Sequence, residues 1–347
     1  MRGAIIGFGN VAAYGHVPGW RGRGDVELVA ATDVRAEQRA ECATHLPGAR
    51  WYRSAEALLA EERLDFIDIC TPPSSHAHLI HAGLERGLHV LCEKPLVRTL
   101  GELASVAARA RASQRVLHAV HNWHHAPIVE LASRLIADGE IGDVQRVIWH
   151  TLRSRPAVAG NGNGQNWRLD PEIAGGGVLS DHGWHVAYLI QRWLGVPPVS
   201  VSARLETRRH AAWRVEDTAN VFLAFPAATA DVFLTWAADE RRNWARIEGA
   251  SGHIELHDDV LVLLGGGTER RWACPPLSNG SHHPEWFGGV VDAFVAEVNG
   301  AAAAGGNLAE ATLCLVIEAL ARESSRRGGE TMAVPSAAGI GTVPEWP

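Results

Sequence analysis

Lysine is almost absent from this sequence of 347 residues. Lys94 is the only one, and arginine supplies the rest of the 32 basic side chains. The net charge of −7 argues against a nucleic-acid binder, which would carry a basic stripe. No run of about 18 apolar residues occurs, so we expect no membrane-spanning helix. Neither nucleic acid nor a membrane is therefore expected as a partner.

Cysteine is scarce and shows no pattern. The five cysteines are widely spaced, are odd in number and form no CxxC motif: Cys42, Cys70, Cys92, Cys274 and Cys314. This usage is typical of a reduced protein with small buried thiols. The first residues, MRGAIIGFGN, lead directly into an apolar stretch, so we expect no signal peptide and a cytoplasmic location.

Strands and helices alternate over the first 120 residues. Apolar runs predict strands at 3–8, 26–33, 64–71, 88–93 and 115–121, and helical spacing predicts helices at 35–46, 76–87 and 100–113. Such alternation is typical of βαβ units and a parallel sheet.

The pattern changes after about residue 122. One more helix is predicted at 127–142, and alternating segments follow at 144–154, 198–209, 218–237 and 243–264. They indicate a mixed or antiparallel sheet with one face covered. Helices are predicted again at 286–299 and 308–327, and glycine-rich residues 159–166 predict a flexible loop, which would either order over a substrate or be an ordinary surface loop.

A dinucleotide-binding turn follows the first strand. It reads Gly7-x-Gly9-x-x-Ala12, with glycines for tight curvature and close approach to a pyrophosphate, and a helix opening behind them. Asp33 ends the second strand, where a carboxylate accepts ribose hydroxyls and repels a 2′-phosphate. This favours NAD over NADP, although Arg35 lies nearby. The residues expected at the cofactor are Gly7, Phe8, Gly9, Asn10, Val11 and Asp33.

A second informative stretch is GGGVLSDHGWHVAYLIQRWLG, residues 175–195. Asp181 and His185 stand four residues apart, which predicts one shared helix face. A carboxylate beside an imidazole suits a general base near neutral pH. The alternative is a helix-capping Asp and an ordinary surface His. His182 lies off that face, and the spacing matches no zinc pattern, so no metal is expected.

The chain resembles the glucose–fructose oxidoreductase/inositol dehydrogenase (Gfo/Idh/MocA) family. The matching pieces occur in the family's order and span nearly the full chain: GFGNVA (7–12), TPPSSHAHLIHAGLERGLHVLCEKPL (71–96), ADGEIGDVQRV (137–147), NWRLDPEIAGGGVLSDHGWH (166–185) and LAEATLCLVIEALARESSRRGG (308–329).

The resemblance implies an α/β fold of two domains. The first would be a Rossmann dinucleotide-binding domain, residues 1–121. The second would be an α+β domain, residues 122–347, with a large open-faced, mostly antiparallel sheet that mediates homodimers or homotetramers.

The resemblance also implies site residues. It places Lys94, Asp181 and His185 around the reacting carbinol of a substrate. It places Thr71, Pro72, His76, Glu93 and Lys94 near the dinucleotide. It places Trp167 and Arg168 where the family lines the cofactor or substrate pocket.

One stretch departs from the family pattern. Residues 122–127 read NWHHAP, so Trp123 and His124 stand where arginines are frequent in the family. This difference indicates a neutral substrate or one with a different anchor. His124 is a candidate for the substrate pocket or an unremarkable histidine, and the same alternatives hold for His282 and His283.

The resemblance further implies an NAD(P)-dependent oxidoreductase acting on a CH–OH group of a sugar, aminosugar, inositol or related polyol. His185 would be the general base, oriented by Asp181, and Lys94 would stabilise charge on the same oxygen. Two alternatives remain open at this point: redox-neutral glycoside cleavage through transient oxidation of the sugar, and a non-catalytic dinucleotide sensor.

Overall fold

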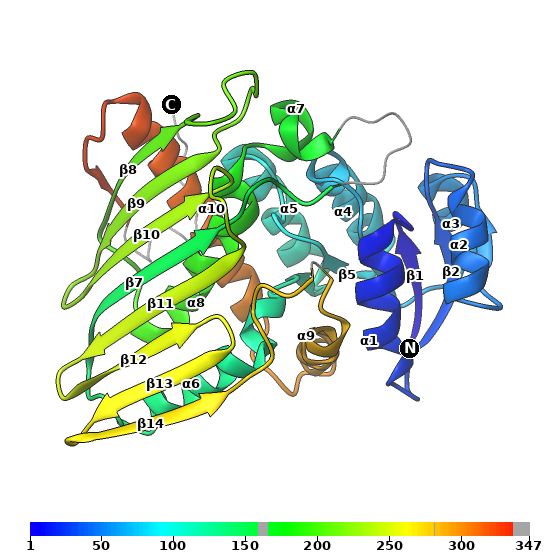
Figure 1. The fold of residues 1–347 in the computed structure, drawn as a ribbon. Coiled ribbons are helices and arrows are strands. Elements are labelled where there is room, and N and C mark those ends of the chain that lie inside the picture. Colours follow the sequence, from blue (N-terminus) through cyan, green and yellow to red (C-terminus); the bar gives the residue numbers. More distant parts are fainter. Residues whose placement is uncertain (159–165, 281, 336–347) are drawn as a thin grey trace. The chain divides into compact units, whose positions relative to one another are not determined.

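The computed structural model describes residues 1–158, 166–280 and 282–335 (Figure 1). Within these residues the chain forms two compact units. Unit 1 contains residues 1–122 and 282–311, and unit 2 contains residues 123–158, 166–280 and 312–335. Unit 1 thus takes in a C-terminal segment beyond the expected range 1–121. The loop expected at 159–166 lies, up to residue 165, outside the described residues.

Unit 1 is built on a six-stranded parallel sheet. Its strands run in the order β3-β2-β1-β4-β5-β6, the order of a dinucleotide-binding Rossmann fold. Their bounds are β1 Arg2–Ile6, β2 Glu27–Thr32, β3 Arg50–Tyr52, β4 Phe66–Ile69, β5 His89–Cys92 and β6 Leu117–Ala119. The expected parallel sheet is confirmed, although β3 was not anticipated because it is only three residues long.

Helices join successive strands of unit 1, and further helical residues come from its C-terminal segment. The helices are α1 Val17–Arg21, α2 Gln38–His45, α3 Ala55–Glu61, α4 His76–Glu85, α5 Leu100–Ser113, α9 Pro284–Val298 and the start of α10 Gly306–Arg326, together with the π-helical turn η1 Ala12–His16 and the 3-10 turn η2 Pro73–Ser75. Helix α5 begins with a capping box, in which Thr99 and Glu102 each bond to the other's backbone N–H.

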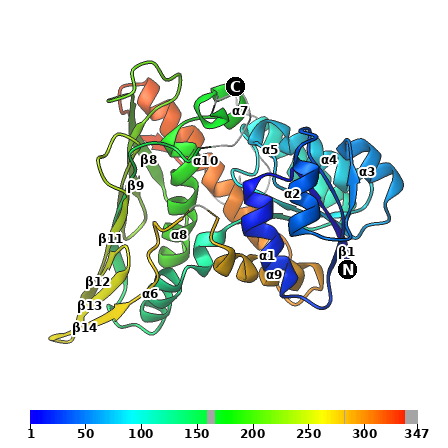
Figure 2. The same ribbon diagram turned by 45° about the vertical axis from the view of Figure 1, so that its right-hand side comes forward.

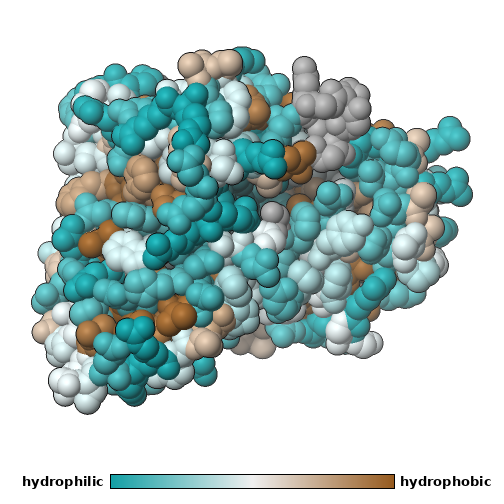
Figure 3. Space-filling view, viewed as in Figure 1, coloured by the Kyte–Doolittle hydropathy of each residue, from teal (hydrophilic) through white to brown (hydrophobic). Residues whose placement is uncertain are grey.

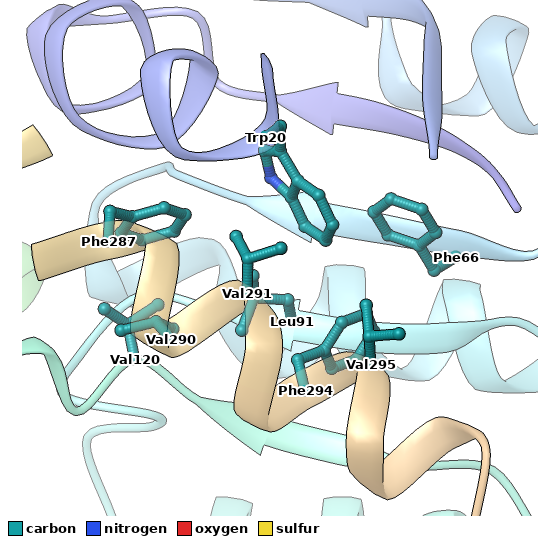
Figure 4. Packing of buried hydrophobic residues seen from close by; sticks show 9 residues of the cluster. All are labelled: Trp20, Phe66, Leu91, Val120, Phe287, Val290, Val291, Phe294 and Val295. Atoms are coloured by element: carbon teal, nitrogen blue, oxygen red, sulfur yellow. The ribbon is translucent and has the colours of Figure 1, made fainter. Parts of the chain in front are cut away.

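Both faces of the unit 1 sheet are buried, which explains the apolar runs of its strands. In β4, Phe66 packs toward α9 and α1, while Ile67 faces Gly83 of α4. Figure 4 shows the first of these layers, in which Trp20, Phe66 and Phe294 contact one another. The C-terminal segment 282–311 therefore completes the core of unit 1.

Unit 2 is built on a nine-stranded sheet. Its strands run in the order β14-β13-β12-β11-β7-β10-β9-β8-β15, and every pairing except the parallel β7–β10 pair is antiparallel. Their bounds are β7 Val144–Leu152, β8 Ser200–Glu206, β9 Thr218–Ala224, β10 Thr229–Thr235, β11 Arg242–Gly249, β12 Gly252–His257, β13 Val260–Gly265, β14 Thr268–Ala273 and β15 Met332–Ala333. The expected mostly antiparallel sheet is confirmed.

Helices cover one face of this sheet (Figures 1 and 2). They are α6 Pro127–Ala137, α8 Trp184–Leu194 and the second part of α10, and short turns accompany them at η3 Asn122–His125, η4 Trp167–Leu169, α7 Pro171–Ala174 and η5 Leu179–Gly183. Residues of β10 alternate between buried and half-buried. Figure 3 looks onto the other face, where hydrophilic and hydrophobic side chains are mixed. Among the described helices none combines the length and apolarity needed to span a bilayer.

Truncating Phe294 tests whether the C-terminal segment stabilises unit 1. Phe294 is fully buried, so Phe294→Ala should lower the free energy of unfolding by roughly 3–5 kcal/mol. Phe294→Leu keeps most of the volume and should cost less. Chemical denaturation followed by tryptophan fluorescence measures both. Equal, small losses for the two variants would contradict the proposed packing.

Candidate active site

The glycine turn after β1 adopts a conformation that requires glycine. Gly7 has a φ of +93°, and a Cβ there would lie 2.8 Å from the backbone nitrogen of Thr71. The turn after β1 is therefore packed against the turn after β4, because these two strands are neighbours in the sheet. Two of the predicted cofactor residues, Gly7 and Thr71, are brought together at the carboxyl edge, where ligands of such sheets bind.

The other residues of the glycine turn divide between core and surface. Phe8 is fully buried in a cluster with Ile5 and Ala12, so only its backbone can face a ligand. Asn10 is exposed and Val11 is half-buried.

Asp33 lies beyond the end of β2 and is engaged by Arg35. The Arg35 backbone N–H donates to Asp33 Oδ1 at 2.9 Å, and its Nε donates to the same oxygen at 3.1 Å. The Arg35 guanidinium also lies beside Gly9. A carboxylate and a guanidinium thus share the position expected for the adenosine ribose.

His76 connects two turns at the carboxyl edge of the sheet. Its ring is buried, with Nε2 2.8 Å from the Thr71 carbonyl and Nδ1 2.9 Å from the Pro95 carbonyl. Burial lowers the pKa of His76, against the opposing effect of these backbone bonds. His76 therefore lies between the Thr71–Pro72 turn and the Glu93–Lys94–Pro95 turn, and a neutral ring donates to one of the two carbonyl oxygens.

Lys94 follows β5 and is half-buried. Its backbone N–H donates to the carboxylate of Glu93 at 2.9 Å, and the peptide bond between Lys94 and Pro95 is cis. The Glu93 carboxylate also contacts His16, at 3.0 Å between Oε1 and Nε2. Burial disfavours the Glu93 carboxylate, but His16 and Lys94 outweigh it and lower the pKa of Glu93.

In unit 2 each glycine of the triplet 175–177 is required for a different reason. Gly175 ends α7 with a φ of +84°, a left-handed conformation that glycine adopts without strain. A Cβ on Gly177 would overlap the Glu216 carbonyl oxygen, and one on Gly176 would overlap Ser180. The Glu216 carboxylate accepts bonds from the N–H groups of Gly177 and Leu179. The triplet thus lets Glu216 cap the turn that carries Asp181.

His185 is held by aromatic residues. Its ring stacks on Trp123 with centroids 4.4 Å apart and an interplanar angle of 9°, and its Nδ1 lies 2.8 Å from the Tyr188 hydroxyl oxygen. The Trp123 backbone N–H donates to that same oxygen at 3.0 Å. His124 packs on Tyr188, with centroids 4.5 Å apart. Of the NWHHAP stretch, Trp123 therefore contacts the predicted general base, and His124 contacts its hydroxyl partner Tyr188.

Asp181 lies in the π-helical turn η5 and is largely buried. Its Oδ2 is 3.7 Å from Nε2 of His182. Arg153 and Arg241 interact with it electrostatically. Burial, together with the charge of Arg241, lowers the pKa of Arg153 to about 10. Burial also lowers the pKa of Arg241. Asp181 and Asp258 oppose both shifts. Asp181 thus lies within electrostatic range of two arginines of unit 2.

Four further candidates have other neighbours. Arg168 stacks on Trp167, with its guanidinium carbon 4.3 Å from the ring centroid, and both are half-buried. In unit 1, His282 packs beside Tyr14 and His283 stacks on Trp286.

The residues at the edge of unit 1 fit a dinucleotide. The Gly7 turn requires glycine, a helix opens behind it, and Asp33 with Arg35 stands one strand away.

Sequence reasoning missed Tyr188, His16 and Glu216. A signal existed for Tyr188, because it stands three residues after His185 on the same helix. Asp68, which contacts His16, is a charged residue inside the otherwise apolar strand FIDI. Nothing in the sequence pointed to Glu216, which comes from a distant loop.

Known proteins match both units. Residues 1–121 match the model of the oxidoreductase family with an NAD-binding Rossmann fold, and residues 129–255 match the GFO/IDH/MocA C-terminal domain. D-apiose dehydrogenase of Paraburkholderia graminis is 27% identical over 284 residues, covering 80% of this chain and 73% of that protein. D-glucoside 3-dehydrogenase of Escherichia coli is 32% identical over 206 residues, covering 58% and 57%.

Solved structures show the same fold. An oxidoreductase from Agrobacterium radiobacter, solved with NAD+, L-tartaric acid and magnesium, superposes with a TM-score of 0.85 at 20% identity over 99% of each chain. An inositol dehydrogenase homologue from Azotobacter vinelandii, complexed with NAD+, has a TM-score of 0.80 at 22% identity over 96% of this chain and 97% of that one. The chain belongs to the GFO/IDH/MocA family of oxidoreductases, and its first unit is the family's NAD-binding Rossmann domain.

Proposed function

We propose that this protein is an NAD-dependent dehydrogenase that oxidises a CH–OH group of a sugar, aminosugar, inositol or related polyol. The observation that carries the proposal is the setting of His185, a buried imidazole stacked on Trp123 with Nδ1 bonded to Tyr188. Support comes from the names of the relatives, which include dehydrogenases of apiose and of glucosides.

In this proposal His185 removes the hydroxyl proton through Nε2. That role needs the tautomer in which Nδ1–H donates to the Tyr188 oxygen, which also accepts the Trp123 N–H. Asp181 raises the basicity of His185. The Lys94 ammonium donates to the substrate oxygen and stabilises its developing negative charge.

The cofactor would be held by the Gly7–Val11 turn, by Asp33 and by the Thr71–Pro72 turn. Hydride acceptance is the chemistry that bound NAD supplies. The protein's own contribution is to bind, to orient and to move the proton.

The decisive experiment is a panel of sugars, aminosugars and inositols with NAD and with NADP, read by absorbance of the reduced cofactor. Reduction by at least one polyol supports the proposal. None of the observations favours glycoside cleavage or sensing. Release of an aglycone without added NAD, and with no net reduced cofactor, would replace net oxidation by cleavage.

Removing either proposed catalytic group should abolish most turnover. We expect Lys94→Ala and His185→Ala each to lower kcat by at least about 100-fold, the low end for a positioned acid or base. Binding of NAD, measured by thermal shift, should persist in both. Near wild-type turnover in Lys94→Ala would refute the role of Lys94.

Tyr188→Phe is a matched variant of His185→Ala. It keeps the ring that packs on His124 and removes only the hydroxyl at Nδ1, so it should lower kcat by less than His185→Ala and leave the folded state intact.

Asp33 should set the cofactor preference. Wild-type protein should be stabilised more by NAD than by NADP, because the carboxylate repels a 2′-phosphate. Asp33→Asn removes this repulsion and frees Arg35, so the preference should shift toward NADP. Thermal shift at equal cofactor concentrations measures the difference. Unchanged preference in Asp33→Asn would place the discrimination elsewhere.

We propose that copies of the chain associate through the open face of the unit 2 sheet, as a dimer or tetramer. Support comes from Phe222, which is 39% exposed there, and from the outward group of Phe233, His150 and Trp244. The five free cysteines support a reducing compartment such as the cytoplasm.

A charge on the open face should disrupt such an assembly. Phe222→Glu should shift the molar mass measured by light scattering toward that of one chain. Val34→Glu, at an exposed position in unit 1, is the matched control and should leave the mass unchanged. A monomeric wild-type protein would refute the association.

A further inference from the structure

His16 lies in the core of unit 1 with a carboxylate at each ring nitrogen. Nδ1 is 3.0 and 2.9 Å from the two oxygens of Asp68, and Nε2 is 3.0 Å from Oε1 of Glu93. The side chain of His16 is 1% exposed and that of Asp68 is fully buried. The His16–Asp68 pair is therefore fully buried, and Glu93 is the more exposed member of the cluster, at 16%.

The geometry requires a doubly protonated ring. A carboxylate can only accept, so each nitrogen that faces one must donate. A neutral imidazole would leave one lone pair opposed to a carboxylate oxygen. Burial disfavours the charged ring, but Asp68 outweighs it with help from Cys70, and the pKa of His16 is raised well above its usual value.

Every element packed around His16 contributes a neighbour. Trp20 of α1 donates its indole N–H to Asp68 Oδ2 at 2.7 Å, and Phe287 of α9 stacks on the ring with centroids 3.9 Å apart. Cys70 lies 3.2 Å from Nδ1, and burial raises the pKa of its thiol to about 12. The charged groups that face His16 are thus Asp68 and Glu93.

Glu93 contacts both His16 and Lys94. One of its oxygens receives His16 and the other accepts the backbone N–H of Lys94 at 2.9 Å. A single carboxylate therefore links an imidazolium in the first helical segment to the backbone of the only lysine in the chain. Rotation of the Glu93 side chain would release both.

We propose that His16 is a positioning residue, an imidazolium clamped between Asp68 and Glu93 that fixes the Glu93–Lys94 backbone and so aims the Lys94 ammonium. The inference rests on the proposed function, because it assigns the purpose of the clamp to the role of Lys94. It also explains why Asp68 interrupts an apolar central strand.

The test is His16→Gln, which keeps one amide donor and removes the charge. We expect kcat to fall by about 10- to 100-fold, the scale of losing a partner that orients a catalytic group. The affinity for NAD should change by less than about threefold, because the clamp orients Lys94 and leaves the Gly7 turn unchanged.

His118→Gln is the matched control. His118 is also a buried histidine of unit 1 paired with a carboxylate, Glu297, at 2.7 Å. It should lose stability comparably while keeping kcat. An equal fall of kcat in both variants would reduce the effect of His16 to general destabilisation and overturn the proposal.

A double-mutant cycle separates the clamp from other roles. If His16 acts through Glu93, the variant His16→Gln/Glu93→Gln should be no slower than the slower single variant. Additive losses of kcat would overturn the proposal. Full activity of His16→Gln together with an inactive Lys94→Ala would also overturn it, but would leave the proposed function intact. Full activity of Lys94→Ala would overturn both.

A charged His16 predicts that the stability of the protein depends on pH. Because its pKa is raised by folding, its stabilising contribution is complete below about pH 6.5, the ordinary value, and is lost as pH rises through the folded-state pKa. The gap in Tm between wild type and His16→Gln should shrink over that rise. A Tm gap that does not change with pH would show that His16 is not an imidazolium in the folded protein. One equivalent of metal in purified wild type, absent from His16→Gln, would replace the clamp with a metal site.

Discussion

The parallel pairing of β1 with β4 is the constraint on which unit 1 depends. It brings the turn after β1 against the turn after β4, so closely that Gly7 has no space for a side chain beside Thr71. Because β5 is the next strand, the Glu93–Lys94 turn ends at the same edge. His76 lies between these turns, with a carbonyl oxygen of each beside one of its ring nitrogens. The proposed dinucleotide site and the candidate catalytic lysine therefore lie at one sheet edge.

Burial on both faces of the sheet makes any charge within it expensive, and unit 1 meets that cost by pairing. Asp68 is fully buried in β4, and its oxygens receive the Trp20 indole and the His16 ring. An uncompensated carboxylate there would be strongly destabilising. The charges alternate from Asp68 through His16 and Glu93 to Lys94, so the group is close to neutral.

Periodicity and motif spacing predicted the two sheets, the glycine turn and most helices, because these depend on local patterns of burial. The short β3 and helix α3 were not anticipated, since segments of three and seven residues carry little periodic signal. Site residues could be proposed from the sequence where one motif held the residue, as for Lys94 and His185, but the contacts of such residues could not be predicted in full. Contacts were not predictable where partners come from distant segments, as for Trp123 beside His185 and Glu216 beside Gly177.

Asp181 and His185 stand four residues apart, but they lie in helical segments of different kinds. Residues four apart share a face only while the helix keeps its regular bonding. Here Asp181 lies in the π-helical turn η5, and His185 lies in the regular helix α8 that follows. Within α8 the rule holds, and His185 meets Tyr188 one turn on. A π-helical turn also ends at His16, and such turns are frequent at functional sites. In each unit, a residue of the proposed chemistry therefore lies within a π-helical turn, His16 in unit 1 and Asp181 in unit 2.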